Sequence, residues 1–322
     1  MGRFILVRLL QMIPLIFGIT LLTFAIINLV PGSPLADLEF NPRARPEDRE
    51  RIAENLGLNE PMHERYITWV GNLVQGDLGL SLQNFVPVRD RIFAVMPNTL
   101  LLTLCSTIFA LVISIPLGIY SAVRRNSIFD NFTTVGSMAA FAMPSFWLAF
   151  LLLLLFGVKI REWGLPGLPT SGTYDLRGGG GFWDRAEHLI LPTISLGLVQ
   201  LAGWTRYIRG SMLEVIRLDY IRTAESKGLR NRAVLFGHAF RNALLPLVTL
   251  VGLSLPDLFG GAFVVETIFA WNGMGRLAVD AARQNDYTLV MGLTLMFAVL
   301  TLVSNLIADV MYAVLDPRIR FG

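Results

Sequence analysis

The side chains with the most capacity for chemistry lie in one basic segment, residues 207–242. Eight Arg and Lys residues fall between Arg206 and Arg241, and the segment reads as helix, glycine break, helix. In the second helical piece, apolar residues recur at i, i+4, i+7 and i+11, a spacing that places them on one helix face. They are Leu229, Ala233, Phe236 and Phe240. An apolar face in a loop needs a partner, so the piece either docks in a groove on a cytoplasmic protein or lies in the lipid interface.

The sequence offers no catalytic constellation. It lacks Gly-x-Ser-x-Gly and His-Glu-x-x-His, and neither Lys159 nor Lys227 stands in a Gly-x-x-x-x-Gly-Lys-Ser/Thr phosphate loop. Its three histidines are far apart in the chain, and the single Cys105 cannot form an internal disulfide or a cysteine-built metal site. We therefore expect a chain that is not an enzyme by itself and that binds no metal, cofactor or ATP of its own.

Long apolar stretches must position this basic segment. The 322 residues are 53% hydrophobic and only 16% charged, with a mean hydropathy of +0.56. Six stretches are long enough to cross a hydrocarbon core of roughly 30 Å. They cover residues 9–30, 99–123, 132–158, 189–208, 243–265 and 288–314. The pattern predicts an all-α polytopic membrane protein with six transmembrane helices; a cleaved leader is the alternative for the first stretch.

The charges fall unequally on the two sides of this arrangement. The N-terminus, residues 124–131, residues 206–241 and the C-terminal tail carry a net charge of +9, whereas the opposite side carries −4. Positive charge favours the cytoplasmic side, so we expect both termini and the basic segment in the cytoplasm. Membrane topology thus accounts for the pI of about 9.2, and no nucleic-acid partner is needed.

The polar stretch 32–97 would lie outside, between the first helix (residues 1–31) and the core (residues 98–314). Helical patterns at 46–56 and 62–73 predict a small helical segment at the outer mouth. Within the core, residues 209–242 form the cytoplasmic loop, and residues 315–322 form a cytoplasmic tail.

Two features inside the apolar stretches suggest a transport pathway. Asp257 follows Pro256 in mid-stretch, where an acid is costly in lipid. It therefore faces a pathway, makes a helix-packing hydrogen bond, or reaches the interface. Pro144 removes a helical hydrogen bond and would bend its helix, either as a static kink or at a gate.

The basic segment resembles the cytoplasmic Glu-Ala-Ala…Gly loop of ABC importer permeases, in particular the first permease of the dipeptide/oligopeptide/nickel group. Residues 222–224 (Arg-Thr-Ala) take the place of Glu-Ala-Ala, and Gly228 that of the fixed glycine. Arg241 replaces the usual proline, a departure also usual in this group. Further similar motifs cover nearly the whole chain, with a departure at 271–272. They lie at 29–34, 56–61, 76–81, 87–88, 97–100, 144–147, 265–269, 273–275 and 315–318.

The resemblance implies a type I ABC importer permease fold in a bacterial or archaeal inner membrane. The implied partners are a paralogous second permease, two cytoplasmic ATPases that carry ATP and Mg, and an external binding protein that delivers a peptide or a related small solute. The implied ATPase-coupling residues are Arg222, Thr223, Ala224, Glu225, Lys227, Gly228, Leu229, Ala233, Phe236, Phe240 and Arg241. In this family a segment near Glu266 dips toward the pathway, so that residue is either a gate or an anchor. A self-contained channel or ion-coupled carrier is the alternative function.

Overall fold

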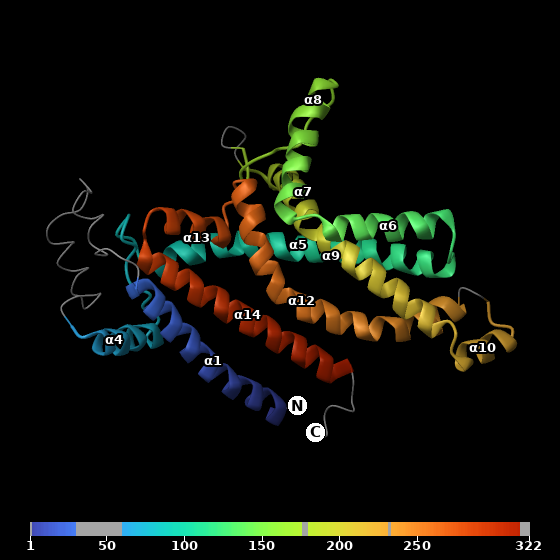
Figure 1. The fold of residues 1–322 in the computed structure, drawn as a ribbon, viewed down its shortest axis with the longest axis horizontal. Coiled ribbons are helices and arrows are strands. Elements are labelled where there is room, and N and C mark those ends of the chain that lie inside the picture. Colours follow the sequence, from blue (N-terminus) through green and yellow to red (C-terminus); the bar gives the residue numbers. More distant parts are fainter. Residues whose placement is uncertain (1, 30–59, 176–179, 231–232, 316–322) are drawn as a thin grey trace. The chain divides into compact units, whose positions relative to one another are not determined.

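The computed structural model describes residues 2–29, 60–175, 180–230 and 233–315 (Figure 1). Over these ranges the chain is almost entirely helical, and the one β-type contact is an isolated bridge between Leu80 and Pro87. Four of the described helices are long and apolar enough to cross a membrane. They are α1 (Gly2–Leu29), α5 (Val88–Val123), α9 (Phe182–Val215) and α14 (Tyr287–Leu315). The expectation of an all-α membrane protein is therefore confirmed.

The apolar stretch 132–158 is broken rather than continuous. α6 (Ile128–Ala142) is followed by α7 (Ser145–Leu152), the π-helical segment η1 (Leu153–Lys159) and α8 (Ile160–Glu162). The chain bends by 106° between α6 and the run that begins with α7, which would give a fifth span if the bent pair crosses the membrane once. The bend expected at Pro144 is present and is a complete break, because Pro144 places the preceding Met143 in extended backbone and ends α6.

The chain divides into two compact units, and the first holds residues 1–99 and 272–306. In it, α4 (Met62–Val74) forms the helix expected over 62–73 and packs on α1. Tyr66 lies 3.0 Å from the Thr20 hydroxyl, and Trp69 stacks on Phe24. α13 (Met274–Arg283) packs with the starts of α5 and α14 around a buried core. The helix expected over 46–56 lies outside the described residues.

The second unit holds residues 100–271 and 307–322. It contains most of α5, α6 to α9, α10 (Asp219–Ser226), the π-helical segment η2 (Val234–Phe240) and α12 (Arg241–Ile268). α9 packs against α6, α7 and α12, and the long helices α9 and α12 correspond to the predicted apolar stretches 189–208 and 243–265.

Glycines let α5 and α9 approach closely. A Cβ on Gly118 of α5 would stand 2.8 Å from Ile208 and 2.9 Å from the backbone oxygen of Thr205 on α9. A Cβ on Gly197 of α9 would stand 2.8 Å from Phe109 on α5. Small residues at such crossings are typical of packed membrane helices. The crossing fixes the end of α9, and the basic segment continues directly from that end.

Candidate functional site

The basic segment leaves α9 at Val215 and forms α10 after a short turn (Figure 1). α10 ends at a glycine break, as expected from the sequence. The amide of Gly228 donates to the Glu225 carbonyl at 2.9 Å, and Gly228 has a φ of +74°. No atom lies within 4 Å of the position that a Cβ would take there. Gly228 is thus required by the backbone conformation, which L side chains disfavour, and not by crowding.

α10 has one buried face. Ile221 and Ala224, three residues apart, join a core cluster that includes Ile208 and Met212 of α9 and Val234 of η2. This apolar contact holds α10 against the end of α9. Ala224, predicted as a coupling residue, is therefore an anchor of the segment and not part of its outer surface.

The other face of α10 is exposed, together with residues 227–230, which follow it. In the predicted coupling set, the exposed residues are Arg222, Thr223, Glu225, Lys227, Gly228, Leu229, Ala233 and Phe236. Charged and small polar groups lie side by side on this surface. Among the described residues, the ion pair of the Arg222 side chain is a long one of 3.8 Å with the exposed Asp219.

The apolar stripe predicted for residues 229–240 is exposed in part but is not one regular helix face. Leu229 and Phe236 are exposed, with 42% and 54% of their surface accessible, and Phe240 is half-buried. Because Val234–Phe240 is π-helical, the expected i, i+4, i+7 and i+11 spacing does not describe one regular α-helical face. Phe236 and Phe240 still meet edge to face, with ring centroids 6.1 Å apart. Arg241 begins α12.

A side-chain hydrogen bond ties α10 to α12. The amide nitrogen of Asn242 donates to the phenol oxygen of Tyr220 at 2.8 Å and to the backbone oxygen of His238 at 3.1 Å. No pattern in the sequence identifies this pair. The two residues are 22 positions apart, and only their positions flanking the glycine break could have suggested the contact.

A buried ion pair supports α9 just before the basic segment. Arg209 of α9 binds Asp130 of α6 through both carboxylate oxygens, with Nη2–Oδ2 at 2.8 Å. Asp130 is 1% exposed and Arg209 is 26% exposed. Asp130 also accepts from the amide of Asn126 in the α5–α6 turn, whose φ is +63°. The pair therefore joins the start of α6 to the end of α9, directly beside the route into α10.

The predicted pathway residues lie on α7 and α12. Pro144 stands at the break before α7, and Pro256 and Asp257 lie within α12. Glu266 lies in the last turn of α12 and is fully buried, and its backbone oxygen accepts from the amide of Trp271 at 2.8 Å.

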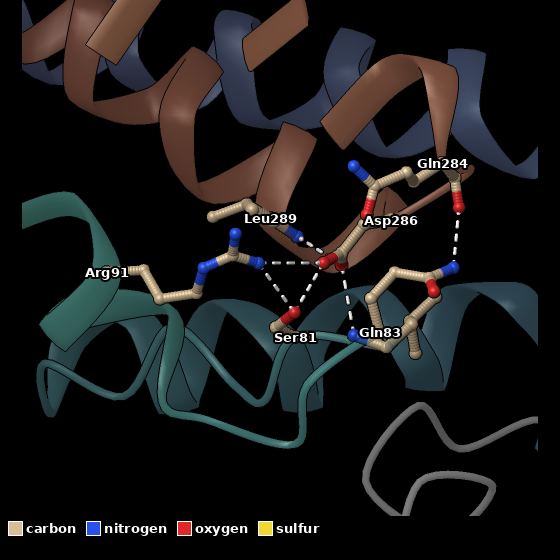
Figure 2. A network of polar contacts seen from close by, with 7 residues as sticks. Ser81, Gln83, Arg91, Gln284, Asp286 and Leu289 are labelled. Carbon is tan, nitrogen blue, oxygen red and sulfur yellow. Dashed lines mark hydrogen bonds and ion pairs between the residues drawn. The ribbon is translucent and has the colours of Figure 1, made fainter. Parts of the chain in front are cut away.

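In the first unit, a second polar centre surrounds Asp286 (Figure 2). This carboxylate is 1% exposed and accepts from the Ser81 hydroxyl, from the Leu82 amide at 3.0 Å and from the Leu289 amide at 3.2 Å. Arg91 points toward the same group, with Nη1 at 3.4 Å from Oδ2. The bond to the Leu289 amide caps the start of α14. These hydrogen bonds connect residues 81–82 to the α13–α14 turn. The contact spans 204 positions, and no local sequence pattern predicts it.

No group of three or more His, Cys, Asp or Glu side chains that could hold a metal ion occurs within the described ranges. The Asp130–Arg209 pair joins α6 to α9, and the Asp286 carboxylate caps α14. The face of α10 that carries Arg222, Thr223 and Glu225 is exposed.

Comparison with known proteins gives this arrangement its family. Residues 114–321 match the family described as binding-protein-dependent transport system inner membrane component, and residues 1–103 match the corresponding N-terminal family. The chain is 46% identical over 322 residues to the oligopeptide transport system permease protein AppB of Bacillus subtilis, with all of both chains covered.

Two further relatives are similar over nearly their whole length. The dipeptide transport system permease protein DppB of Escherichia coli K12 is 40% identical, with 99% of each chain covered. The glutathione transport system permease protein GsiC of Escherichia coli O6:H1 is 36% identical, with all of both chains covered. The chain therefore belongs to the binding-protein-dependent transport system inner membrane components, the permeases of ABC importers.

Proposed function

We propose that this chain is the first permease of an ABC importer for peptides and that α10 is the helix through which it engages a cytoplasmic ATPase. The cargo is supported by the relatives, which are named for oligopeptide, dipeptide and glutathione transport. All three solutes are short peptides, so a short peptide is the cargo class that they share.

The observation that carries the coupling role is the two-faced structure of α10. Ile221 and Ala224 bury one face in the core of the second unit, and the opposite face, with Arg222, Thr223 and Glu225, is exposed. Because α10 is packed on α9 by one face and exposed on the other, a bound partner that displaces α10 would displace α9 with it. Gly228 then turns the chain sharply enough for η2 and α12 to begin beside α10.

The energy must come from that partner. The sequence holds no phosphate loop, so ATP and Mg are assigned to two cytoplasmic ATP-binding subunits. A paralogous second permease would complete the pathway, and an external binding protein would deliver the peptide. In this scheme the permease contributes surfaces and movement, and the ATPases contribute hydrolysis.

The membrane arrangement proposed has six spans with both termini in the cytoplasm. Five follow from α1, α5, the bent pair, α9 and α14. α12 would be the sixth, since its 28 residues extend about 42 Å at 1.5 Å per residue, more than the hydrocarbon thickness. The +9 charge of the side that holds the basic segment supports this orientation.

Four residues are proposed for the pathway region. The break at Pro144 gives that part of the chain a bend of 106°, and Pro256 and Asp257 place a helix-weakening residue and an acid in the middle of α12. Glu266 is fully buried at the end of α12, which favours the role of an anchor over that of a gate.

Cysteine cross-linking tests the coupling role. In a Cys105→Ser background, Thr223→Cys and Glu225→Cys should cross-link to the ATPase, because both positions are exposed on α10. Glu187→Cys, exposed near the opposite end of α9, is the matched control and should not. Cross-linking from 187 but not from 223 or 225 would overturn the assignment.

A glycine substitution gives an independent test. Gly228→Arg should abolish ATPase association while the chain still inserts in the membrane, since the left-handed backbone at 228 is strained for arginine. Gly210→Arg adds the same side chain at a helical glycine with open space beside it and should retain association. If the purified chain alone moved peptides down a gradient, a channel or carrier would replace the importer.

The cargo is tested on the binding protein that copurifies with the chain. Mass spectrometry of its bound ligand should show a peptide. A metal chelate or a sugar would contradict the proposed cargo class and leave the ATPase-coupling role standing.

A further inference from the structure

An apolar hollow of about 520 Å³ lies in the second unit, between the end of α5, the start of α6 and η2. Its size falls in the range of roughly 300–1,000 Å³ that is usual for small-molecule sites. No lining residue carries a formal charge. The lining includes Tyr120 and Val123 of α5, Phe129 of α6, and Leu235, Phe236 and Phe240 of η2. It is therefore built for an apolar occupant.

The hollow opens to the surface of this chain. Tyr120, Val123 and Phe236 are 47%, 49% and 54% exposed. Two aromatic pairs stand in its wall. Tyr120 meets Phe129 edge to face at 4.7 Å between ring centroids, and Phe236 meets Phe240 in the same way. Edge-to-face contacts are a favourable arrangement of aromatic rings, so the two pairs stabilise this wall.

Two arginines stand at the same end of α5. The guanidinium of Arg124 lies 6.0 Å from the centre of the Tyr120 ring, which itself lines the hollow. Arg125 follows it, and both side chains are exposed. Neither forms an ion pair within 4 Å in the described part of the chain. Arg125 interacts with the Asp130 carboxylate at longer range, but both oxygens of that carboxylate are bound by Arg209. The rim thus offers positive charge directly beside an apolar hollow.

We propose that this hollow is a binding site for one anionic phospholipid, with an acyl chain among the lining residues and the phosphate on Arg124 and Arg125. Three observations point to a lipid. α5 is long and apolar enough to span a membrane, the hollow lies at its end, and the charge complementarity is that of a phosphodiester above a hydrocarbon chain. Basic pockets between membrane helices on the cytoplasmic side bind anionic headgroups in this way.

The site has a structural link to the basic segment. Leu235, Phe236 and Phe240 belong to η2, which packs against α10 and α12. An acyl chain in the hollow would therefore fix η2 against α5. This link does not depend on the assignment of α10 as a coupling helix, and the lipid site can be tested by binding alone.

The test is native mass spectrometry of the full chain, purified in detergent with the subunits that copurify with it. Phosphatidylglycerol and phosphatidylcholine with identical acyl chains are added in turn. The wild type should retain one phosphatidylglycerol in preference to phosphatidylcholine. Arg124→Gln should weaken phosphatidylglycerol retention about fivefold, the effect of one lost cation near an anionic membrane surface. It should weaken phosphatidylcholine retention less, because the choline cation offsets the phosphate charge of that lipid.

The matched charge control is Arg8→Gln. Arg8 also lies over an aromatic ring, that of Phe4 at 5.5 Å, but Phe4 does not line the hollow. This variant should retain the lipid as the wild type does. Equal losses from Arg8→Gln and Arg124→Gln would show general surface attraction and overturn the site.

The apolar half is tested by filling the hollow. Val123→Trp should remove retention of both lipids, whereas Val112→Trp, on an exposed part of α5 that does not line the hollow, should not. Retention unchanged in Val123→Trp would overturn the proposal.

A protein occupant is distinguished by labelling Val123→Cys with a maleimide in a Cys105→Ser background. Labelling that is fast in the chain alone and blocked in the complex after delipidation would show that a subunit, not a lipid, covers the hollow. Labelling blocked by added phosphatidylglycerol in either preparation supports the lipid.

Discussion

The amide nitrogen of Asn242, in the first turn of α12, donates a 2.8 Å hydrogen bond to the phenol oxygen of Tyr220 on α10. It is a direct polar link between the helix proposed to face the ATPase and a helix proposed to cross the membrane. Ile221 and Ala224 make the apolar contact to α9. α10 is thus connected to both α9 and α12, and a displacement of α10 can move two helices together.

Tyr220→Phe should lower the peptide transported per ATP hydrolysed while ATPase association stays unchanged. Both side chains are exposed, and a hydrogen bond of this kind contributes only about 0.5–1.5 kcal/mol to stability, so folding should be little affected. Transport and hydrolysis are measured together in proteoliposomes. Tyr207→Phe, which removes a hydroxyl on α9 that is not hydrogen-bonded to any described residue, is the control. An unchanged ratio of peptide transported to ATP hydrolysed in Tyr220→Phe would show that the Tyr220–Asn242 hydrogen bond does not couple α10 to α12.

The Asp130–Arg209 pair should stabilise the junction of α6 and α9. Removing one partner of a buried pair costs roughly 3–5 kcal/mol. Because Arg209 is partly exposed, we expect about 3 kcal/mol for Asp130→Ala, the lower end of that range. The double variant Asp130→Ala/Arg209→Ala should be less destabilised than Asp130→Ala alone, since no uncompensated charge remains. Thermal unfolding in detergent measures both, and additive effects of the two single changes would contradict a direct pair.

The sequence predicted the long elements well because apolar runs of 20 or more residues have few alternatives to a membrane helix. It also predicted the glycine break, since Gly228 separates two helical patterns and adopts a positive φ. The apolar stripe was predicted less well. The predicted spacing holds for an α-helix, but residues 234–240 form the π-helical η2. Phe236 and Phe240 therefore line a hollow with α5 and do not continue one straight face.

Other features depend on contacts that a single sequence does not carry. Pro144 indicated a bend, but its 106° angle depends on how α7 packs on α9 and α12. Ser81 and Asp286 are 205 positions apart, and neither has a neighbour that identifies the other. The same holds for Asp130, which local sequence marks only as an acid in the first turn of a helix.

Asp286→Ala should weaken the connection between residues 81–82 and the start of α14, because Asp286 makes the hydrogen bonds that join them. The change removes the cap from the Leu289 amide, at roughly 0.5–2 kcal/mol, and leaves the buried Leu82 amide without its acceptor, at roughly 1–3 kcal/mol. Amide hydrogen exchange at residues 80–83 should rise with little change in the second unit. Asp280→Ala, in an exposed 3.7 Å pair with Arg276, should have almost no effect. Exchange that rises equally in both units would mean a global loss of stability instead.

Gly118→Ala should separate α5 from α9. The added Cβ would stand 2.8 Å from Ile208 and 2.9 Å from the Thr205 carbonyl, and the latter is backbone that cannot rotate away. Overpacking of this kind costs roughly 1–3 kcal/mol. Gly136→Ala, at a helical position on α6 with nothing within 4 Å, is the control and should be neutral or slightly stabilising, because alanine is the better helix former. Thermal unfolding compares the two variants. Equal stability would show that α5 and α9 can shift by several tenths of an ångström without loss, and the crossing would then not be the fixed point from which α9 positions the basic segment.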